Sequence, residues 1–108
     1  MKTKTLPPAF VHEMAGALRV MGHPYRLRIV ERLDLGGAAP GHVLLSALGG
    51  AQGALSQHVT RLRQAGVLRA ERRGREVWYA LASPAARTIL ECMRRKHAET
   101  AGGRRERT

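Results

Sequence analysis

The sequence has 108 residues, 44% of them hydrophobic and 4% aromatic, which suits one globular domain with a modest and mostly aliphatic core. It has no apolar run of the roughly 20 residues that a membrane-spanning helix needs, and its first residues lack the apolar stretch of a secretory signal. Its single cysteine excludes an internal disulfide and predicts a cytoplasmic protein. Without a membrane-spanning segment, we expect no membrane partner.

The charge balance is the strongest bulk feature. Nineteen Lys and Arg against eight Asp and Glu give a net charge of +11, and sixteen of the basic residues are arginine. Such an excess repels itself unless a polyanion such as DNA, RNA or an anionic membrane surface neutralises it. A GC-rich genome also raises the arginine count, but it does not explain why the arginines cluster between residues 61 and 75.

The first part of the chain predicts an extended arm and two helices. The arm covers residues 1–9 and ends at a proline pair. From Phe10 onward, apolar residues recur at three- and four-residue spacing, which is typical of a helix. These residues are Val11, Met14, Ala15, Leu18 and Met21. Gly22 and His23 break this helix, and Pro24 stands at a favourable first-turn position of a second helix that ends near Asp34.

Two further helices are predicted on either side of a glycine turn. A short helix fits residues 42–48, and Gly49-Gly50 forces a tight turn. The next helix spans residues 52–65, with Leu55, Val59 and Leu62 on its core face. At 100° per residue, the face opposite the core is polar and basic. It consists of Gln57, Thr60, Arg61 and Gln64, with Ser56 and Arg63 on one flank and His58 on the other.

The rest of the chain predicts a hairpin and a last helix. Two strands, about 67–72 and 76–81, are joined by Arg73-Gly74-Arg75, whose glycine permits the positive φ of a tight turn. Ser83-Pro84 resembles an N-cap followed by a first-turn proline. The last helix carries an apolar stripe, and residues 99–108 read as a disordered basic tail.

The resulting fold class is mainly α with a β-hairpin wing. The order α-α-α-α-β-β-α, with a short turn between the third and fourth helices, is a winged helix-turn-helix domain over residues 10–98. From Arg61 to Arg75 the chain carries six arginines and one acid, Glu71. A helix with a polar outer face can lie in the major groove of DNA, and a basic hairpin beside it can reach phosphates or the minor groove. We therefore expect double-stranded DNA as the partner.

Two segments resemble the ArsR/SmtB family of winged-helix bacterial repressors. They are ALSQHVTRLRQAGVLRAERRGREVWYAL (54–81) and ALRVMGHPYRLRIVERL (17–33), and the resemblance covers about residues 10–95. It implies a homodimer formed by the first and last helices, a palindromic operator and release by an inducer, whose identity is unknown. The implied dimer contacts are Phe10, Met14, Leu18, Ile89, Cys92 and Met93.

The same resemblance implies a set of DNA contacts. On the recognition helix and the wing these are Gln52, Ser56, Gln57, Thr60, Arg61, Arg63, Arg72, Arg73 and Arg75. His58 matches the family's histidine, and its flank position favours a packed, hydrogen-bonded role over a direct DNA contact. Ala51 stands where the family usually has serine or threonine, and Gly53 weakens the helix start by up to ~1 kcal/mol relative to alanine.

The sequence leaves several alternatives for the inducer site. The paired cysteines of metal-sensing relatives are missing, so we predict neither a metal nor a cofactor, although a site shared across the dimer with His12 or His23 remains an alternative. Relatives that sense sulfur species or oxidants use two cysteines. Here Cys92 alone can bridge only to its copy in a dimer or be modified singly. Its place on the apolar stripe favours packing instead.

Two other functions compete with a specific repressor. A non-specific architectural DNA-binding protein would also use a charge of +11. An enzyme is not expected, because the sequence has no phosphate loop, HExxH motif or nucleophile elbow. Ser56 and His58 are two residues apart on a helix and point in different directions, so they cannot form a catalytic pair.

Overall fold

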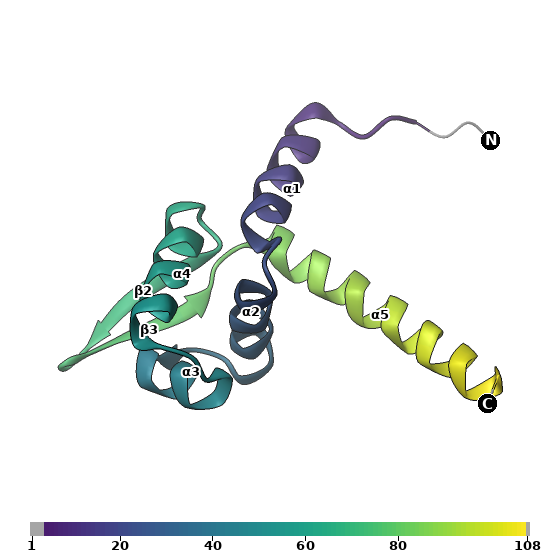
Figure 1. Cartoon of the computed structure of the whole chain (residues 1–108). Coiled ribbons are helices and arrows are strands. Elements are labelled where there is room, and N and C mark those ends of the chain that lie inside the picture. Colours follow the sequence, from purple (N-terminus) through teal and green to yellow (C-terminus); the bar gives the residue numbers. More distant parts are fainter. Residues whose placement is uncertain (1–3, 108) are drawn as a thin grey trace.

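The computed structural model describes the backbone of residues 4–107 and the side chains of residues 4–101. The predicted order of four helices, two strands and a final helix is confirmed, with one additional short strand (Figure 1). The elements are α1 (Pro8–Met21), α2 (Pro24–Gly36), β1 (Ala39–Pro40), α3 (Gly41–Leu48), α4 (Gln52–Gln64), β2 (Leu68–Arg73), β3 (Glu76–Leu81) and α5 (Pro84–Arg107).

The three strands form one antiparallel sheet in the order β1-β3-β2. The two residues of β1, Ala39 and Pro40, lie opposite Tyr79 and Trp78 of β3. The sequence predicted only a turn at Pro40, because two residues are too few to show the alternation of a strand. The pairing therefore depends on a partner strand that comes much later in the chain.

The helix-turn-helix unit forms as predicted. Gly49 and Gly50 adopt φ values of +77° and +89°, a region that glycine enters without steric cost, and they redirect the chain between α3 and α4. The chain leaves α4 through Gly66, with a φ of +78°, and enters β2. The hairpin tip also needs glycine, because Gly74 has a φ of +62°.

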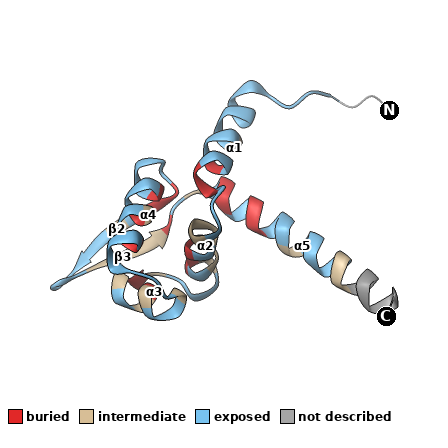
Figure 2. Cartoon of the chain, viewed as in Figure 1, coloured by how far each residue is buried: buried red, intermediate tan, exposed pale blue. Residues whose placement is uncertain are grey.

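The core lies where α2, α3 and α4 meet the sheet and the adjoining ends of α1 and α5. Its largest fully buried side chains are Met21, Ile29, Leu44, Leu62, Val30 and Val67. Buried positions on α1 lie near its end, and those on α5 near its start (Figure 2). The remaining lengths of both helices extend away from the body of the domain (Figure 1).

Two predicted boundaries are wrong. Helix α1 begins at Pro8, so the predicted arm 1–9 is too long; the proline ring presets the helical φ, and the Val11 N–H donates to the Pro7 carbonyl over 3.0 Å. Helix α5 continues through Arg107, where a disordered tail was predicted from residue 99. No proline follows Pro84 to stop it, and the Thr100 hydroxyl donates to the Lys96 carbonyl. Residues 1–3 and 108 lie outside the described residues.

Candidate nucleic-acid interface

Helix α4 presents the predicted polar face to solvent. Its inner face is fixed because Leu55, Val59 and Leu62 are buried in the core. The side chains predicted to contact DNA from this helix are all exposed, and they are Gln52, Ser56, Gln57, Thr60, Arg61 and Arg63. The 3.6-residue period of the helix therefore separates a buried apolar face from an exposed polar face along the same segment.

A shallow groove of about 420 Å³ runs along part of this face. It brings together Ser56, Gln57, Thr60 and Arg61, four of the six predicted α4 contacts. Gln52 lies outside it, in a smaller cavity of about 210 Å³ between α3, α4 and β3, which Ser56 also lines. Arg63 lines neither of these two hollows.

The first turn of α4 is uncapped, as the sequence predicted. Ala51 is the N-cap residue, and none of the described side chains caps the first N–H groups of the helix. A side chain at Gly53 would meet nothing within 4 Å. The start of the recognition helix thus presents open backbone N–H groups, which favour nearby negative charge.

His58 ties α4 to the start of α2. Its Nδ1 accepts a hydrogen bond of 3.1 Å from Arg26 Nε, and its ring centroid lies 4.5 Å from that of His23. Burial is the main factor that lowers the pKa of His58 below its ordinary value of 6.5, and the charges of His23, Arg26 and Arg61 lower it further. The sequence favoured a packed, hydrogen-bonded role for His58, and these contacts support that interpretation, but the sequence did not identify Arg26 as the partner.

The wing has two chemically different faces. Because side chains alternate along a strand, Arg72 shares a face with Leu68, which is buried. Arg73 lies on the opposite face, where its guanidinium contacts Glu71 over 3.1 Å and covers the Trp78 ring at 4.3 Å. Arg73 also belongs to β2 and not to the turn, which is formed by Gly74 and Arg75 alone. The predicted wing contacts are therefore not equivalent.

A polar side-chain contact joins the wing to the helix-turn-helix unit. His42 Nδ1 on α3 lies 3.0 Å from Glu76 Oε2, at the start of β3. The pair could not be identified from the sequence, because the two residues are distant in the chain. Because Glu76 pairs with Arg73 next to the turn, the contact holds the tip end of the wing beside α3.

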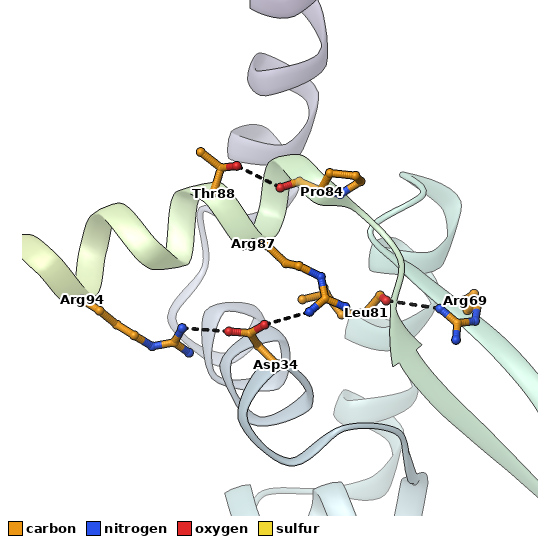
Figure 3. A network of polar contacts seen from close by, with 7 residues as sticks. All are labelled: Asp34, Arg69, Leu81, Pro84, Arg87, Thr88 and Arg94. Carbon is orange, nitrogen blue, oxygen red and sulfur yellow. Dashed lines mark hydrogen bonds and ion pairs between the residues drawn. The ribbon is translucent and has the colours of Figure 1, made fainter.

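Most arginines of α4 and the wing have no acidic partner. Of the six between residues 61 and 75, only Arg73 lies within 4.0 Å of a carboxylate among the described residues. The other five are Arg61, Arg63, Arg69, Arg72 and Arg75. Arg69 instead donates to the Leu81 carbonyl over 3.3 Å (Figure 3). The like charges in this region are thus left for an external anion to neutralise.

Helices α1 and α5 carry the residues predicted for the dimer interface. Phe10, Leu18, Cys92 and Met93 are exposed on these helices, and Met14 is half-buried. Ile89 differs, because only 9% of it is exposed and it packs in the core of its own chain. Its place on the dimer interface stays a prediction, and its burial shows that its own protomer already covers most of this side chain.

A second arginine cluster, not predicted from the sequence, joins α2 to α5. Asp34 Oδ2 accepts from Arg94 Nη1 over 2.8 Å, and Asp34 Oδ1 accepts from Arg87 Nη1 over 3.2 Å (Figure 3). The Asp34 side chain is only 14% exposed. One carboxylate thus holds two turns of α5 against the end of α2.

Cys92 is an exposed free thiol on α5. Within its own chain it is not the packed residue that the apolar stripe suggested, and Arg95 Nη2 lies 3.9 Å from its Sγ. Among the described side chains, no three His, Cys, Asp or Glu residues are grouped closely enough to hold a metal ion. In the described part of the chain, no helix is both long and apolar enough to cross a membrane.

Comparison with known proteins gives consistent relatives, although no family model matches the chain. It is 35% identical over 77 residues to the uncharacterized HTH-type transcriptional regulator Rv0081 of Mycobacterium tuberculosis, a match covering 71% of this chain and 68% of that protein. It is 42% identical over 77 residues to the HTH-type transcriptional repressor SmtB of the same species, covering 70% of this chain and 56% of the repressor.

Solved structures agree with these sequence matches. The crystal structure of M. tuberculosis Rv0081 superimposes with a TM-score of 0.71 at 31% identity, covering 92% of this chain and 98% of that one. The transcriptional repressor PagR of Bacillus anthracis gives a TM-score of 0.73 at 29% identity, covering 81% of this chain and 99% of that one. The antimony-specific repressor AntR, at 24% identity and a TM-score of 0.81 over 94% of this chain and 92% of that one, shares the fold.

Proposed function

The chain belongs to the ArsR/SmtB family of winged helix-turn-helix transcriptional repressors, and we propose on that premise that it binds a palindromic operator as a homodimer in the cytoplasm. In this proposal α4 enters the major groove and the hairpin of β2 and β3 contacts the flanking backbone. Binding of an inducer then releases the DNA.

The observation that carries the proposal is the unneutralised positive charge on α4 and the wing. Five of the six arginines between residues 61 and 75 have no carboxylate within 4.0 Å among the described residues, and Arg61 lies in the groove with Gln57. Arginine and glutamine are residues that read guanine and adenine edges in the major groove. The proposed DNA contacts are Gln52, Ser56, Gln57, Thr60, Arg61, Arg63, Arg72, Arg73 and Arg75, with Arg73 contributing least because Glu71 already contacts it.

The shape of the protomer supports a homodimer through α1 and α5. Its radius of gyration is 16.2 Å, whereas a compact domain of this length has about 13 Å. The difference arises because two helices extend from the body (Figure 1). They expose Phe10, Leu18 and Met93 to solvent. A second copy that covers these apolar side chains would bury surface that a monomer leaves in water.

Cys92 supports a second candidate for the regulation of this repressor. Because the thiol is exposed on α5, it is accessible either to a single modification or to the Cys92 of a second copy. In this alternative an oxidant or a sulfur species acts as the inducer. Operator binding by the wild type and by Cys92→Ser, each with and without persulfide, decides between the two, since only a thiol-dependent repressor loses its response in the variant.

Specific binding is tested by operator footprinting with an excess of unrelated duplex at fixed salt. A repressor protects one palindrome and binds it ~10³-fold or more tightly than unrelated DNA. An architectural protein, the competing function, protects all sequences alike. Equal affinity for the palindrome and the competitor would contradict the proposal.

The dimer is tested separately with two matched charge substitutions. Leu18→Glu places a carboxylate on α1 at a residue that is 54% exposed in the protomer, so the protomer folds while the dimer dissociates. Leu35→Glu, at a residue that is 69% exposed but lies on α2 and outside the two proposed interface helices, is the control and stays dimeric. Sedimentation of both variants at the same concentration gives the result.

A further inference from the structure

The contact between Arg26 and His58 determines which nitrogen of the imidazole carries a proton. Arg26 Nε donates to His58 Nδ1 over 3.1 Å, and Arg26 Nη1 donates to the Val20 carbonyl over 3.2 Å. The guanidinium is therefore held at two points. A nitrogen that accepts a hydrogen bond presents its lone pair, so Nδ1 is unprotonated and the single proton of the neutral ring is on Nε2.

The groups around His58 oppose a second proton on the ring. From the start of α2 the ring faces His23, Tyr25 and Arg26, with the ring centroids of His23 and Tyr25 at 4.5 and 5.2 Å. On α4 itself the nearby charge is Arg61. Protonation of Nδ1 would break the bond from Arg26 and place a positive charge among other positive charges.

His58 and Arg26 line the groove that holds the predicted DNA contacts. The groove is formed by Ser56, Gln57, Thr60, Arg61 and Gln64 of α4, together with His58 and, from α2, Arg26. His58 lies on the flank of α4 next to α2 and not at the centre of the outward face. We therefore assign it to the backbone contacts that position a protein on DNA and not to the contacts with base edges. A neutral N–H donor at such a position matches an anionic oxygen acceptor.

We propose that His58 donates its Nε2–H to a phosphodiester oxygen of the duplex, and that Arg26 is the positioning residue that holds the imidazole in this neutral tautomer. The inference rests on the proposed DNA-binding face and adds two residues to it. His58 then packs against α2 through Nδ1 and also contacts DNA through Nε2, whereas the sequence favoured packing alone. The inference also makes a specific statement about charge, because the contact removes no counterion from the DNA.

Two substitutions at His58 separate its role as a hydrogen-bond donor to DNA from its packing against Arg26. His58→Asn keeps an acceptor near the position of Nδ1 for Arg26 but lacks the reach of Nε2–H, whereas His58→Gln keeps a donor near the position of Nε2. In operator titrations at pH 7.5, we expect His58→Asn to lose about 10-fold in affinity and His58→Gln to stay close to the wild type. Equal losses in both would show that the effect is structural and would overturn the proposal.

The salt dependence of binding shows whether His58 is charged on DNA, and the sequence preference shows whether its acceptor is a phosphate or a base. His58→Asn should weaken operator and unrelated DNA by the same factor and leave the salt slope unchanged, because a neutral donor to a phosphate carries neither sequence information nor charge. Arg61→Gln is the control and lowers the slope by about one. A slope reduced by about one in His58→Asn would show an imidazolium, and a changed operator preference would show a base contact; either result overturns the proposal.

The role of Arg26 is tested by measuring which tautomer the His58 imidazole adopts. Long-range ¹H–¹⁵N spectra of the whole chain should show the Nε2–H tautomer in the wild type and a mixture of tautomers in Arg26→Met, which keeps the apolar stem but has no donor. Arg26→Gln provides the same measurement if the methionine variant does not fold. An unchanged tautomer in the folded variant would contradict a positioning role.

The outcome also separates this inference from the proposed function. If Gln57→Ala and Arg61→Gln weaken operator binding while His58→Asn does not, only the inference about His58 and Arg26 fails. If none of the three substitutions weakens binding, the proposed DNA-binding face itself is wrong.

Discussion

The arginines of this protein serve two different purposes in two regions. At the junction of α2 and α5, Arg87 and Arg94 share the carboxylate of Asp34, and on the surface of α2 Arg28 pairs with Glu31 over 2.8 Å. On α4 and the wing, by contrast, five of six arginines have no carboxylate within 4.0 Å in the described part of the chain. In the first group Arg87 and Arg94 join α5 to α2 and Arg28 pairs within α2, whereas we propose that the second group binds an anion.

Net charge alone therefore does not locate a binding surface on this molecule. Both regions are rich in arginine, but an ion pair removes most of the external field of its members, while a cluster without acids adds its charges together. The local count of acids is the informative quantity. The second region has two acids, of which Glu71 contacts Arg73 and Glu76 contacts His42.

The largest expected effect is on operator binding by Arg61→Gln. Because Arg61 has no carboxylate beside it among the described residues and lies in the groove of α4, its loss removes a direct DNA contact and should reduce operator affinity at least 10-fold, or about 1.4 kcal/mol. Arg28→Gln, which removes an arginine already paired with Glu31, is the matched control and should leave affinity nearly unchanged. Equal losses in titrations of the two variants would remove the distinction between the regions.

The next effect is on stability, through Asp34→Asn. This change leaves Arg87 and Arg94 without a charged partner at a site where the Asp34 side chain is only 14% exposed. We expect the free energy of unfolding to fall by about 1–2 kcal/mol in urea titrations at fixed protein concentration. Glu31→Gln, in the exposed i, i+3 pair, should cost only about 0.2–0.5 kcal/mol. A cost for Asp34→Asn as small as that control would argue against a structural role for the junction.

A smaller effect distinguishes two arginines within the wing. Arg75 stands in the turn with no carboxylate within 4.0 Å of its guanidinium among the described residues, whereas Arg73 is held by Glu71 and by the face of Trp78. Arg75→Gln should weaken binding to all sequences several-fold and lower the salt slope by about one, and Arg73→Gln should change the slope by less. The reverse order of the two slopes would show that the internal contacts of Arg73 are released on DNA.

The smallest expected effect is the pH dependence of the free energy of unfolding, which His58 contributes at the contact between α4 and α2. Since the pKa of His58 is lowered in the folded protein, the unfolded chain binds more protons below its ordinary pKa of 6.5. The stabilisation from the packed, neutral imidazole of His58 is therefore fully present above pH 6.5. It is lost as the pH falls toward the lowered pKa, because the unfolded chain then takes up the proton more readily. Urea titrations at pH 7.5 and 5.5 should show a larger loss in the wild type than in His58→Asn, and an identical loss would refute this assignment.

Much of the fold and part of the site follow from local pattern. Leu55, Val59 and Leu62 could be assigned to the core from spacing alone, because a helix of 3.6 residues per turn leaves no other face for them. The cap at Ser83 could be predicted in the same way, and Ala86 N–H donates to its hydroxyl over 3.1 Å. Such features depend on neighbours within a few residues.

The features that could not be predicted join residues far apart in the chain. Strand β1 is recognisable only beside β3, and Asp34 finds Arg87 and Arg94 only after α2 and α5 have packed. The same holds for His58, whose flank position was clear but whose donor, Arg26, comes from another helix. Ile89 shows the converse, since its apolar character predicted burial but not which chain buries it.

Residue type and short-range spacing were thus enough to establish the order of the elements, the polar outer face of α4, the glycine turns and the excess of positive charge. Which arginines keep an acid beside them depended instead on how the helices and the wing pack. An ion pair forms at distances of a few ångströms in space, and packing, not proximity in the chain, brings Asp34 to α5 while leaving Arg61 and Arg75 without a carboxylate within 4.0 Å among the described residues.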